Sequence, residues 1–533
     1  MKRAFGQIAL MSTLSRILGM ARDMAFAYTW GRSGLTDLWV VAFMLPNLAT
    51  RLLGEGVLAS AVIPLYLAQQ QEDPDKAARF AGTLATFITT ILALAATAVM
   101  LGLGLWMILC HTINSQQRLL AGLMALMMPY MVIGGLSIII GAVLNAHQHF
   151  LAPASSAVVL NTAIISALLL TNRWTTATQT TKALAIAMAV VSAGLVQVAI
   201  HLRVLRGHQI RIRPCWDLHD PAFRQIGRLL IPTLIGLSIT PINVLLNNIM
   251  AYLASGSGID GSGPLTPGRG WAYQFQQGDV AGLYYAQRLY QFPLGVLGMA
   301  LATAAFPTLS KAFCDGDLHK GRATITEAIK TALFISIPTT IVAIICNKQI
   351  VAGLFQHGSF TSKDTAHVSR ILICYAVGLV AYFLQQVLTR AFYGMPSAGK
   401  TRIPVISGIT AIIANIACSA ILIRQLGVQG VALSTSIAAW IQVAILGHCL
   451  ARRLNINCRQ ELIGVIARIL FASGIMAVAC NWLLALGHYL PQTRLIGLLW
   501  LFVVIGSSGL LYLSTCRLVG LDQVRFVLPD LRS

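Results

Sequence analysis

The sequence predicts an all-α polytopic membrane protein with about fourteen transmembrane helices, arranged as two six-helix halves and a C-terminal pair. The chain of 533 residues is 56% hydrophobic and only 10% charged, and its mean hydropathy is +0.74. Soluble domains, by contrast, are about 25% charged. Apolar runs of about 20 residues, the length that crosses a bilayer, recur along the whole chain. Similar proline-containing stretches also occur in both halves.

Six apolar runs make up the predicted N-terminal lobe, residues 1–205. The first run follows MKRAFGQ, is interrupted by Arg16 and Arg22, and shows no convincing small-residue cleavage site. We therefore interpret it as a retained helix rather than a signal peptide. A basic cytoplasmic loop, 206–228, follows this lobe. The six predicted helices span residues 5–30, 35–66, 80–108, 119–146, 152–172 and 183–202.

The next six runs make up the predicted C-terminal lobe, residues 229–453, and two more lie in 454–533 ahead of a cytoplasmic tail. The Gly- and Pro-rich stretch 255–279 is the longest connection, and the topology places it on the outer face. A loop of this length is either a flexible insertion or a gate or partner contact. These eight predicted helices span residues 229–255, 281–310, 325–355, 366–393, 403–423, 428–451, 460–486 and 495–516.

The two predicted lobes show a weak internal repeat. FMLPNL (43–48) and IPLY (63–66) in the second helix correspond to YQFPLG (290–295) and FPTL (306–309) in the eighth. Each helix carries an early and a late proline with small residues between them. Prolines bend a span where neighbouring helices satisfy the freed backbone groups. Many transporters are built from such repeats.

The distribution of Lys and Arg predicts the orientation of the chain. An even number of spans places both termini on one side, and cytoplasmic loops carry the excess of basic residues. With the N-terminus in the cytoplasm, the inner loops and tails hold most of the 38 Lys and Arg, so we expect both termini there. The net charge of +21 is then mainly a topology signal. Because no soluble basic domain is present, we expect no nucleic acid as a partner.

Charged side chains interrupt the first, second and eighth predicted helices. In the first, Arg16 and Asp23 lie seven residues apart on one stripe of the helix, and Arg22 lies on the adjacent stripe. The predicted substrate-binding residues are Arg16, Arg22, Arg51 and Arg288. The predicted cavity or gating residues are Asp23, Asp37, Glu55, Asn47, Gln287 and Gln291.

Two interpretations of these charges stay open. In the structural one, Arg16 pairs with Asp23 and Arg51 pairs with Glu55, which fixes helix register. However, these three helices hold four arginines and three acids, so at least one cation has no acid to pair with. Charge inside a bilayer is costly and usually marks a polar cavity or a pathway. Since the planar fork of arginine suits phosphate and carboxylate oxygens, the functional interpretation is an anionic, phosphorylated ligand.

At these residues the chain closely resembles the MurJ/MviN family, the lipid II flippases of bacterial peptidoglycan synthesis. The resemblance extends over nearly the whole chain, and several long motifs recur in the same order. These motifs are SRILGMARD (15–23), TDLWVVAFMLPNL (36–48), GEG (54–56), VLNAHQHFLAPA (143–154), RLYQFPLGVLGMALATAAFPTLSK (288–311), LFQHGSFT (354–361) and RAFYGMPSAGKTRIPV (390–405).

The resemblance implies the fold of the multidrug/oligosaccharidyl-lipid/polysaccharide exporter superfamily. In that fold two six-helix lobes surround a central cationic cavity, and helices 13 and 14 form a groove for the lipid tail. It also implies alternating access that moves undecaprenyl-diphosphate-linked disaccharide-pentapeptide across the bacterial cytoplasmic membrane. The family's cavity arginines and acids carry over to the four arginines and three acids above. The chain departs from the family at Thr50, where many relatives have an arginine, and at Gln287, where many have an acid.

We expect lipid II and membrane lipids as partners, with cell-wall synthesis proteins as further candidates. We expect no cofactor and no metal, because the ten cysteines are scattered singly and the histidines lack metal-ligand spacing. No catalytic constellation is recognisable, so we predict a transporter rather than an enzyme. The alternatives are an exporter of another lipid-linked oligosaccharide or a drug in the same superfamily, and a non-transporting scaffold of cell-wall assembly.

Overall fold

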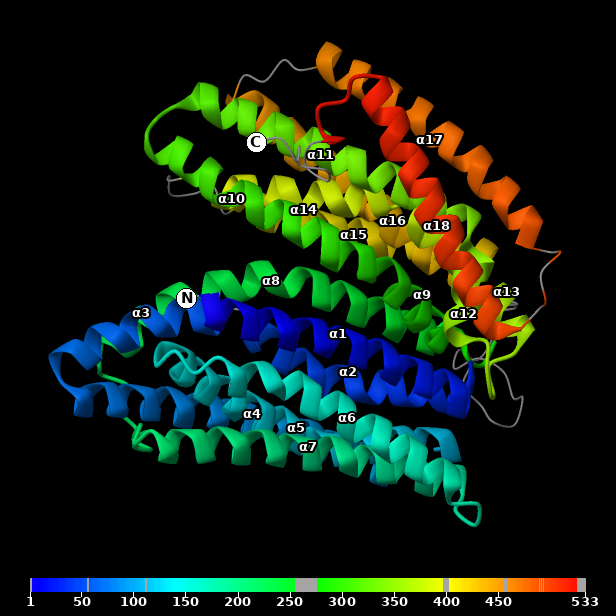
Figure 1. Cartoon of the computed structure of the whole chain (residues 1–533). Coiled ribbons are helices and arrows are strands. Elements are labelled where there is room, and N and C mark those ends of the chain that lie inside the picture. The colour runs from blue at the N-terminus through cyan, green and yellow to red at the C-terminus, as the bar shows by residue number, and fades with distance from the viewer. Residues whose placement is uncertain are drawn as a thin grey trace. The chain divides into compact units, whose positions relative to one another are not determined.

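The computed structural model describes residues 2–54, 57–110, 113–254, 276–395, 402–454, 459–487, 489, 491 and 493–524. Every regular element in these ranges is a helix (Figure 1), which confirms the all-α class. Within them, nine helices are long and apolar enough to cross a membrane, or up to ten if one bent pair is a single span. The chain is therefore an integral membrane protein, and the count of fourteen spans stays a prediction.

Eight helices and residues 276–281 form the described part of the first of two compact units. Figure 1 draws these helices in blue to green, from α1 onwards. They are α1 (Lys2–Trp30), α2 (Gly34–Gly54), α3 (Val57–Glu72), α4 (Pro74–Leu109), α5 (Ser115–Ala146), α6 (Leu151–Arg173), α7 (Gln179–Gly207) and α8 (Pro221–Ala254).

The α5 helix is the core of the first unit, because it packs against α2, α3, α4, α6 and α7. In the most apolar stretch of 18 residues of α5, 56% of the residues are buried, whereas in the corresponding stretch of α4 only 6% of the residues are buried. Small residues permit these close contacts. A Cβ atom at Gly134 would lie 2.6 Å from the side chain of Thr50 on α2, and one at Gly194 would lie 2.9 Å from Tyr130. The apolar surface that α4 leaves exposed is suited to lipid.

The second unit contains the described residues from 282 onwards. Its longest helices pack in neighbouring pairs, α15 with α16 and α17 with α18, and α11 packs against α10, α14 and α17. The elements are α9 (Asp279–Pro293), which starts in the first unit, a π-helix η1 (Leu294–Gly298), α10 (Met299–Cys314), α11 (Leu318–Ile345), α12 (Asn347–Phe355), α13 (Ser362–Ala376), α14 (Leu379–Tyr393), α15 (Arg402–Leu426), α16 (Val428–Leu454), α17 (Arg459–Gly487) and α18 (Arg494–Leu518).

Three predicted spans of the second unit are broken. The predicted helix 325–355 is divided into α11, which ends at Ile345, and α12, which begins at Asn347. The predicted helix 281–310 continues from Pro293 into the π-helix η1, and a proline together with a π-segment explains such a break. The predicted helix 366–393 bends by 42° between α13 and α14. Gly378 lies at this bend, where a Cβ atom would be 2.5 Å from the Ser436 hydroxyl on α16. Close packing therefore requires glycine there.

The lobe boundaries inferred from the sequence, 1–205, 206–228, 229–453 and 454–533, stay predictions. The α8 helix, which was expected to open the second lobe, packs against α2, α3 and α4 in the first unit. The basic segment before it also packs on this unit, since Ile210 and Ile212 contact its hydrophobic core. The last two predicted spans, in contrast, correspond to α17 and α18.

Substituting Gly82 of α4 with alanine is expected to lower the stability of the first unit by about 1–3 kcal/mol. A Cβ atom at Gly82 would lie 1.6 Å from the backbone oxygen of Arg213, so the segment that packs there must move. The measurement is the apparent thermal unfolding midpoint of the detergent-purified protein. Gly102→Ala on the same helix is the matched control, because nothing lies within 4 Å of its added Cβ atom. Equal midpoints for the two variants would show that the backbone contact does not exist.

Candidate functional site

A buried ion pair lies on α1 and is oriented by α6. Arg22 donates from Nε and Nη2 to Oδ1 of Asp23, at 3.0 and 2.8 Å, and from Nη1 to Oδ1 of Asn161 at 3.0 Å. The Asn161 amide nitrogen in turn donates to the backbone oxygen of Ser15 at 3.3 Å. The side chains of Arg22 and Asp23 are 12% and 2% exposed. Asn161 thus fixes the guanidinium of Arg22 between two helices.

The structure pairs Asp23 with Arg22, its chain neighbour, whereas helical spacing suggested a pair with Arg16. The arginine side chain is long enough to reach around the helix to the adjacent stripe. Arg16 itself is exposed. Of the two predicted arginines on α1, Arg22 is the one whose side chain forms a hydrogen bond with another helix, through Asn161 of α6.

Asp37, near the start of α2, caps the N-terminus of α9. Its carboxylate oxygens accept hydrogen bonds from the backbone N–H groups of Gly278 and Ala281, each at 2.7 Å. The Asp37 side chain is buried. The first N–H groups of a helix have no partner within it and favour a negative charge, so this position suits a carboxylate.

A second ion pair, which the sequence did not single out, holds the same turn. Arg32 Nη1 lies 3.0 Å from Oδ1 of Asp279, and Oδ2 of Asp279 accepts a hydrogen bond from the backbone N–H of Gln276 at 2.8 Å. Asp279 is fully buried. A signal was present in the sequence, because an acid directly before an apolar run is typical of a helix start.

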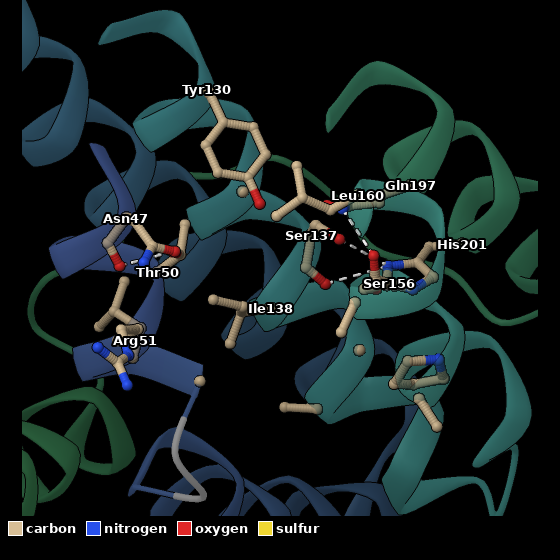
Figure 2. Close-up of a pocket in the computed structure, with 18 of the residues that line it drawn as sticks. Asn47, Thr50, Arg51, Tyr130, Ser137, Ile138, Ser156, Leu160, Gln197 and His201 are labelled. Carbon is tan, nitrogen blue, oxygen red and sulfur yellow. Dashed lines mark hydrogen bonds between the residues drawn. The ribbon is translucent and has the colours of Figure 1, made fainter. Parts of the chain in front are cut away.

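A cavity of about 340 Å³ lies in the first unit between α2, α5, α6 and α7 (Figure 2). From α2, Asn47, Thr50 and Arg51 line it, and two of these, Asn47 and Arg51, are predicted site residues. The Thr50 hydroxyl donates to the backbone oxygen of Asn47 at 2.9 Å. Thr50 thus turns its hydroxyl onto its own helix.

The opposite side of the cavity is polar, and the sequence did not predict it. Figure 2 shows Ser137, Ser156, Gln197 and His201 together there, from α5, α6 and α7. The Gln197 amide donates to the backbone oxygen of Ser156 at 2.9 Å. Gln197 and His201 lie four residues apart on α7, which places them on one helix face, and both are buried. This four-residue spacing of two polar side chains was the signal in the sequence that could have identified this side of the cavity.

In the second unit, Gln287 and Arg288 lie on α9 beside tyrosines. The Gln287 amide donates to the hydroxyl of buried Tyr375 at 3.0 Å. The guanidinium carbon of Arg288 lies 4.7 Å from the centre of the Tyr284 ring, a cation–π distance. This chain therefore places a neutral hydrogen bond between α9 and α13. Gln291 is half-buried one turn further along α9.

The predicted site residues are distributed over both units. Arg16, Arg22, Asp23, Asp37, Asn47 and Arg51 belong to the first unit, and Gln287, Arg288 and Gln291 belong to the second. Glu55, with its expected pairing to Arg51, lies outside the described residues. That these residues bind one ligand together stays a prediction. Among the residues described, no three His, Cys, Asp or Glu side chains are placed to hold a metal ion.

Comparison with known proteins gives consistent matches over nearly the full length. The chain is 25% identical over 531 residues to a probable lipid II flippase MurJ of Buchnera aphidicola (subsp. Acyrthosiphon pisum), with 97% of each chain covered. It is 28% identical over 490 residues to that of Vibrio cholerae, covering 89% of this chain and 87% of the relative.

Two solved structures share the fold. A lipid II flippase MurJ in an inward closed conformation has a TM-score of 0.74 at 20% identity, covering 97% of this chain and 99% of that one. An inward-facing multidrug resistance MATE family transporter has a TM-score of 0.63 at 15% identity, covering 85% of this chain and 98% of that one. The family model for lipid II flippase MurJ matches residues 26–503. This chain therefore belongs to the lipid II flippase MurJ family.

Proposed function

We propose that this chain moves lipid II, the undecaprenyl-diphosphate-linked disaccharide-pentapeptide, from the inner to the outer leaflet of the bacterial cytoplasmic membrane by alternating access. The observation that carries the proposal is the family match across residues 26–503. Relatives named as probable lipid II flippases align over nearly their whole length, as the 97% coverage of the Buchnera protein illustrates. No covalent step is part of this function, so the chain acts as a transporter and not as an enzyme.

The charges of the first unit fit this substrate. A headgroup with diphosphate and peptide carboxylate charges cannot cross about 30 Å of hydrocarbon unaided. Arg22 is held in place by Asp23 and Asn161, and Arg51 lines the cavity of that unit. In the proposed mechanism these two arginines, with Arg16 and Arg288, bind the diphosphate through charge-assisted hydrogen bonds. Asp37, Asn47 and the glutamines of α9 shape the cavity or its gate.

The proposed topology places both termini in the cytoplasm. It follows from the excess of Lys and Arg in the loops that are then internal. In this orientation the basic segment before α8 faces the cytoplasm, and the connection between α8 and α9 faces outward. Lipid II and membrane lipids are the proposed partners, together with proteins of cell-wall synthesis.

A second candidate is export of a drug or of another lipid-linked oligosaccharide. The fold similarity to a multidrug resistance MATE transporter, with a TM-score of 0.63, favours it. This similarity concerns the fold alone, whereas the family match selects lipid II. The two candidates differ in whether lipid II translocation depends on the chain.

Complementation in a bacterium depleted of its own lipid II flippase tests the proposal. Expression of this chain is expected to restore growth and to restore lipid II in the outer leaflet, measured with an impermeant enzyme that modifies only exposed lipid II. Cells are compared at matched levels of the expressed protein in the membrane. Normal membrane levels with no exposed lipid II would overturn the proposal in favour of a different cargo.

A further inference from the structure

Two cysteine thiols from distant parts of the second unit contact each other. Sγ of Cys346 lies 3.4 Å from Sγ of Cys480, although the two residues are 134 positions apart in the chain. Cys346 lies at the junction of α11 and α12, and Cys480 lies on α17, which packs against α11 (Figure 1). Both side chains are fully buried. The proposed transport function gives this pair no role.

The surroundings of the two thiols are apolar. Leu501 and Val504 of α18 complete the buried cluster around them, and Trp500 packs against it. In the part of the chain that the structure describes, no three His, Cys, Asp or Glu side chains are placed to hold a metal ion, so the pair there belongs to no metal site. Two thiols in such a place either pack as small apolar residues or are oxidised to a disulfide.

The geometry of the contact suits a disulfide. An S–S bond is about 2.05 Å long, so its formation brings the two sulfur atoms about 1.4 Å closer together than they lie here. Cys346 lies between two helices and belongs to neither, because α11 ends at Ile345 and α12 begins at Asn347. A small adjustment of this junction supplies the approach without unwinding a helix.

The proposed topology places this contact near the outer face of the membrane, and the inference rests on that part of the proposed function. The predicted spans 325–355 and 460–486 are the ninth and thirteenth, so both run outward. Cys480 lies seven residues before Gly487, the last residue of α17, which is about 10 Å of helix. Disulfides form and persist outside the bacterial cytoplasmic membrane, whereas cytosolic thiols are kept reduced.

We propose that Cys346 and Cys480 form a disulfide bond that ties the C-terminal helix pair, α17 and α18, to α11. The oxidant is a protein disulfide on the outer side of the membrane. The thiolate of Cys480 attacks one sulfur of that disulfide and releases one thiol of the oxidant. The thiolate of Cys346 then attacks Sγ of Cys480 and releases the second. Two electrons and the two thiol protons pass to the oxidant, which becomes a dithiol.

The burial of the pair sets when this exchange takes place. A thiol enclosed in apolar surroundings is inert, so the exchange precedes the packing of α17 against α11. The α17 helix follows α11 in the chain and is synthesised later, so both thiols are accessible until it packs. Once formed, the bond closes a long loop and stabilises the unit by restricting the unfolded chain.

Mass spectrometry of the full-length protein tests the proposal. Cells that express it are quenched with acid, free thiols are alkylated, and the protein is digested without reductant. From the wild type we expect most of the chain to give a linked peptide that contains Cys346 and Cys480 and disappears on reduction. From Cys346→Ala we expect alkylated Cys480. Cys516→Ala removes another buried cysteine, on α18, and is the matched control that keeps the link.

Thermal unfolding of the purified protein gives a second measurement. Reductant reaches the bond as the unit opens on heating, so it is expected to lower the unfolding midpoint of the wild type by about 5 °C. Cys516→Ala is expected to show the same shift, and Cys346→Ala none. A pair that only packs as two thiols predicts no effect of reductant on any of the three proteins.

Labelling of Tyr489→Cys, in a Cys110→Ala background, separates this inference from the proposed topology. Tyr489 is exposed just beyond the end of α17, and the exposed Cys110 is removed because it is also expected on the outer side. An impermeant maleimide is expected to label Tyr489→Cys in intact spheroplasts. Labelling only after lysis overturns the proposed topology, and with it the oxidising compartment that the disulfide requires.

The remaining outcomes concern the disulfide and the transport function separately. If Tyr489→Cys is labelled from outside and the wild type restores growth, recovery of Cys346 and Cys480 as alkylated thiols overturns the inference alone. If the linked peptide is found in a protein that restores no lipid II in the outer leaflet, the inference holds and the proposed transport function is overturned.

Discussion

Arg22→Ala is expected to reduce the rate of lipid II translocation by about ten- to a hundredfold, because it removes hydrogen bonds from a charged group to the proposed diphosphate. It also leaves the buried Asp23 carboxylate without the cation that lies 2.8 Å from it. An uncompensated buried charge of this kind costs about 3–5 kcal/mol of stability. Translocation into the outer leaflet of proteoliposomes and the apparent unfolding midpoint measure the two effects separately.

The double variant Arg22→Ala with Asp23→Asn separates loss of substrate binding from loss of stability. Neutralising both partners removes the unpaired charge, so the unfolding midpoint is expected to recover toward the wild-type value. Translocation is expected to stay low, because the cation is still missing. Recovery of translocation along with stability would show that Arg22 serves only to balance Asp23.

Asp37→Ala is expected to destabilise the start of α9, with a total cost of about 2–5 kcal/mol. The carboxylate accepts hydrogen bonds from two backbone N–H groups, those of Gly278 and Ala281, at 2.7 Å each. Alanine leaves both donors unsatisfied in a buried place. Asp37→Asn keeps one acceptor oxygen and is expected to give an intermediate effect. Hydrogen exchange of the peptide that covers residues 276–284 measures the opening of this turn directly.

Asp73→Ala provides the control for a helix cap in a less buried setting. Asp73 caps α4 by accepting from the backbone N–H of Asp75 at 2.9 Å, and it is partly exposed. Loss of an exposed cap costs about 1 kcal/mol, so its effect is expected to be several times smaller. If Asp37→Ala leaves hydrogen exchange of residues 276–284 at the wild-type rate, the capping role of Asp37 is wrong.

The membrane class and the polar face of α1 could be predicted from the sequence because they depend on local patterns. Apolar runs of sufficient length predicted most of the long helices, and helical spacing placed Arg22 and Asp23 near a polar stripe. The partner that orients Arg22 could not be predicted in this way, since Asn161 is 139 residues away in the chain. Such a contact depends on which helices pack together, and periodicity within one helix does not contain that information.

Asp37 and His201 illustrate the same limit. The sequence identified Asp37 as a charge near the start of a span, but its role depends on backbone donors that lie 241 and 244 residues further along the chain. His201 was one of several histidines near a predicted helix end. Only the packing of α5, α6 and α7 gives both of its ring nitrogens a carbonyl oxygen. Residues acquire these roles from tertiary contacts, which composition and spacing do not specify.

Translocation of fluorescent lipid II in proteoliposomes that contain only this protein tests the proposed function most directly. Lipid II labelled with a dithionite-sensitive dye is placed in both leaflets, and impermeant dithionite is added outside. In vesicles with the wild type, dithionite is expected to quench the dye that starts in the outer leaflet and then the dye that flips from the inner leaflet, so that nearly all fluorescence is lost. In vesicles with Arg22→Ala, the second part of this loss is expected to be much slower. Loss that stops at the outer-leaflet fraction in sealed wild-type vesicles, as in vesicles without protein, would contradict a lipid II flippase.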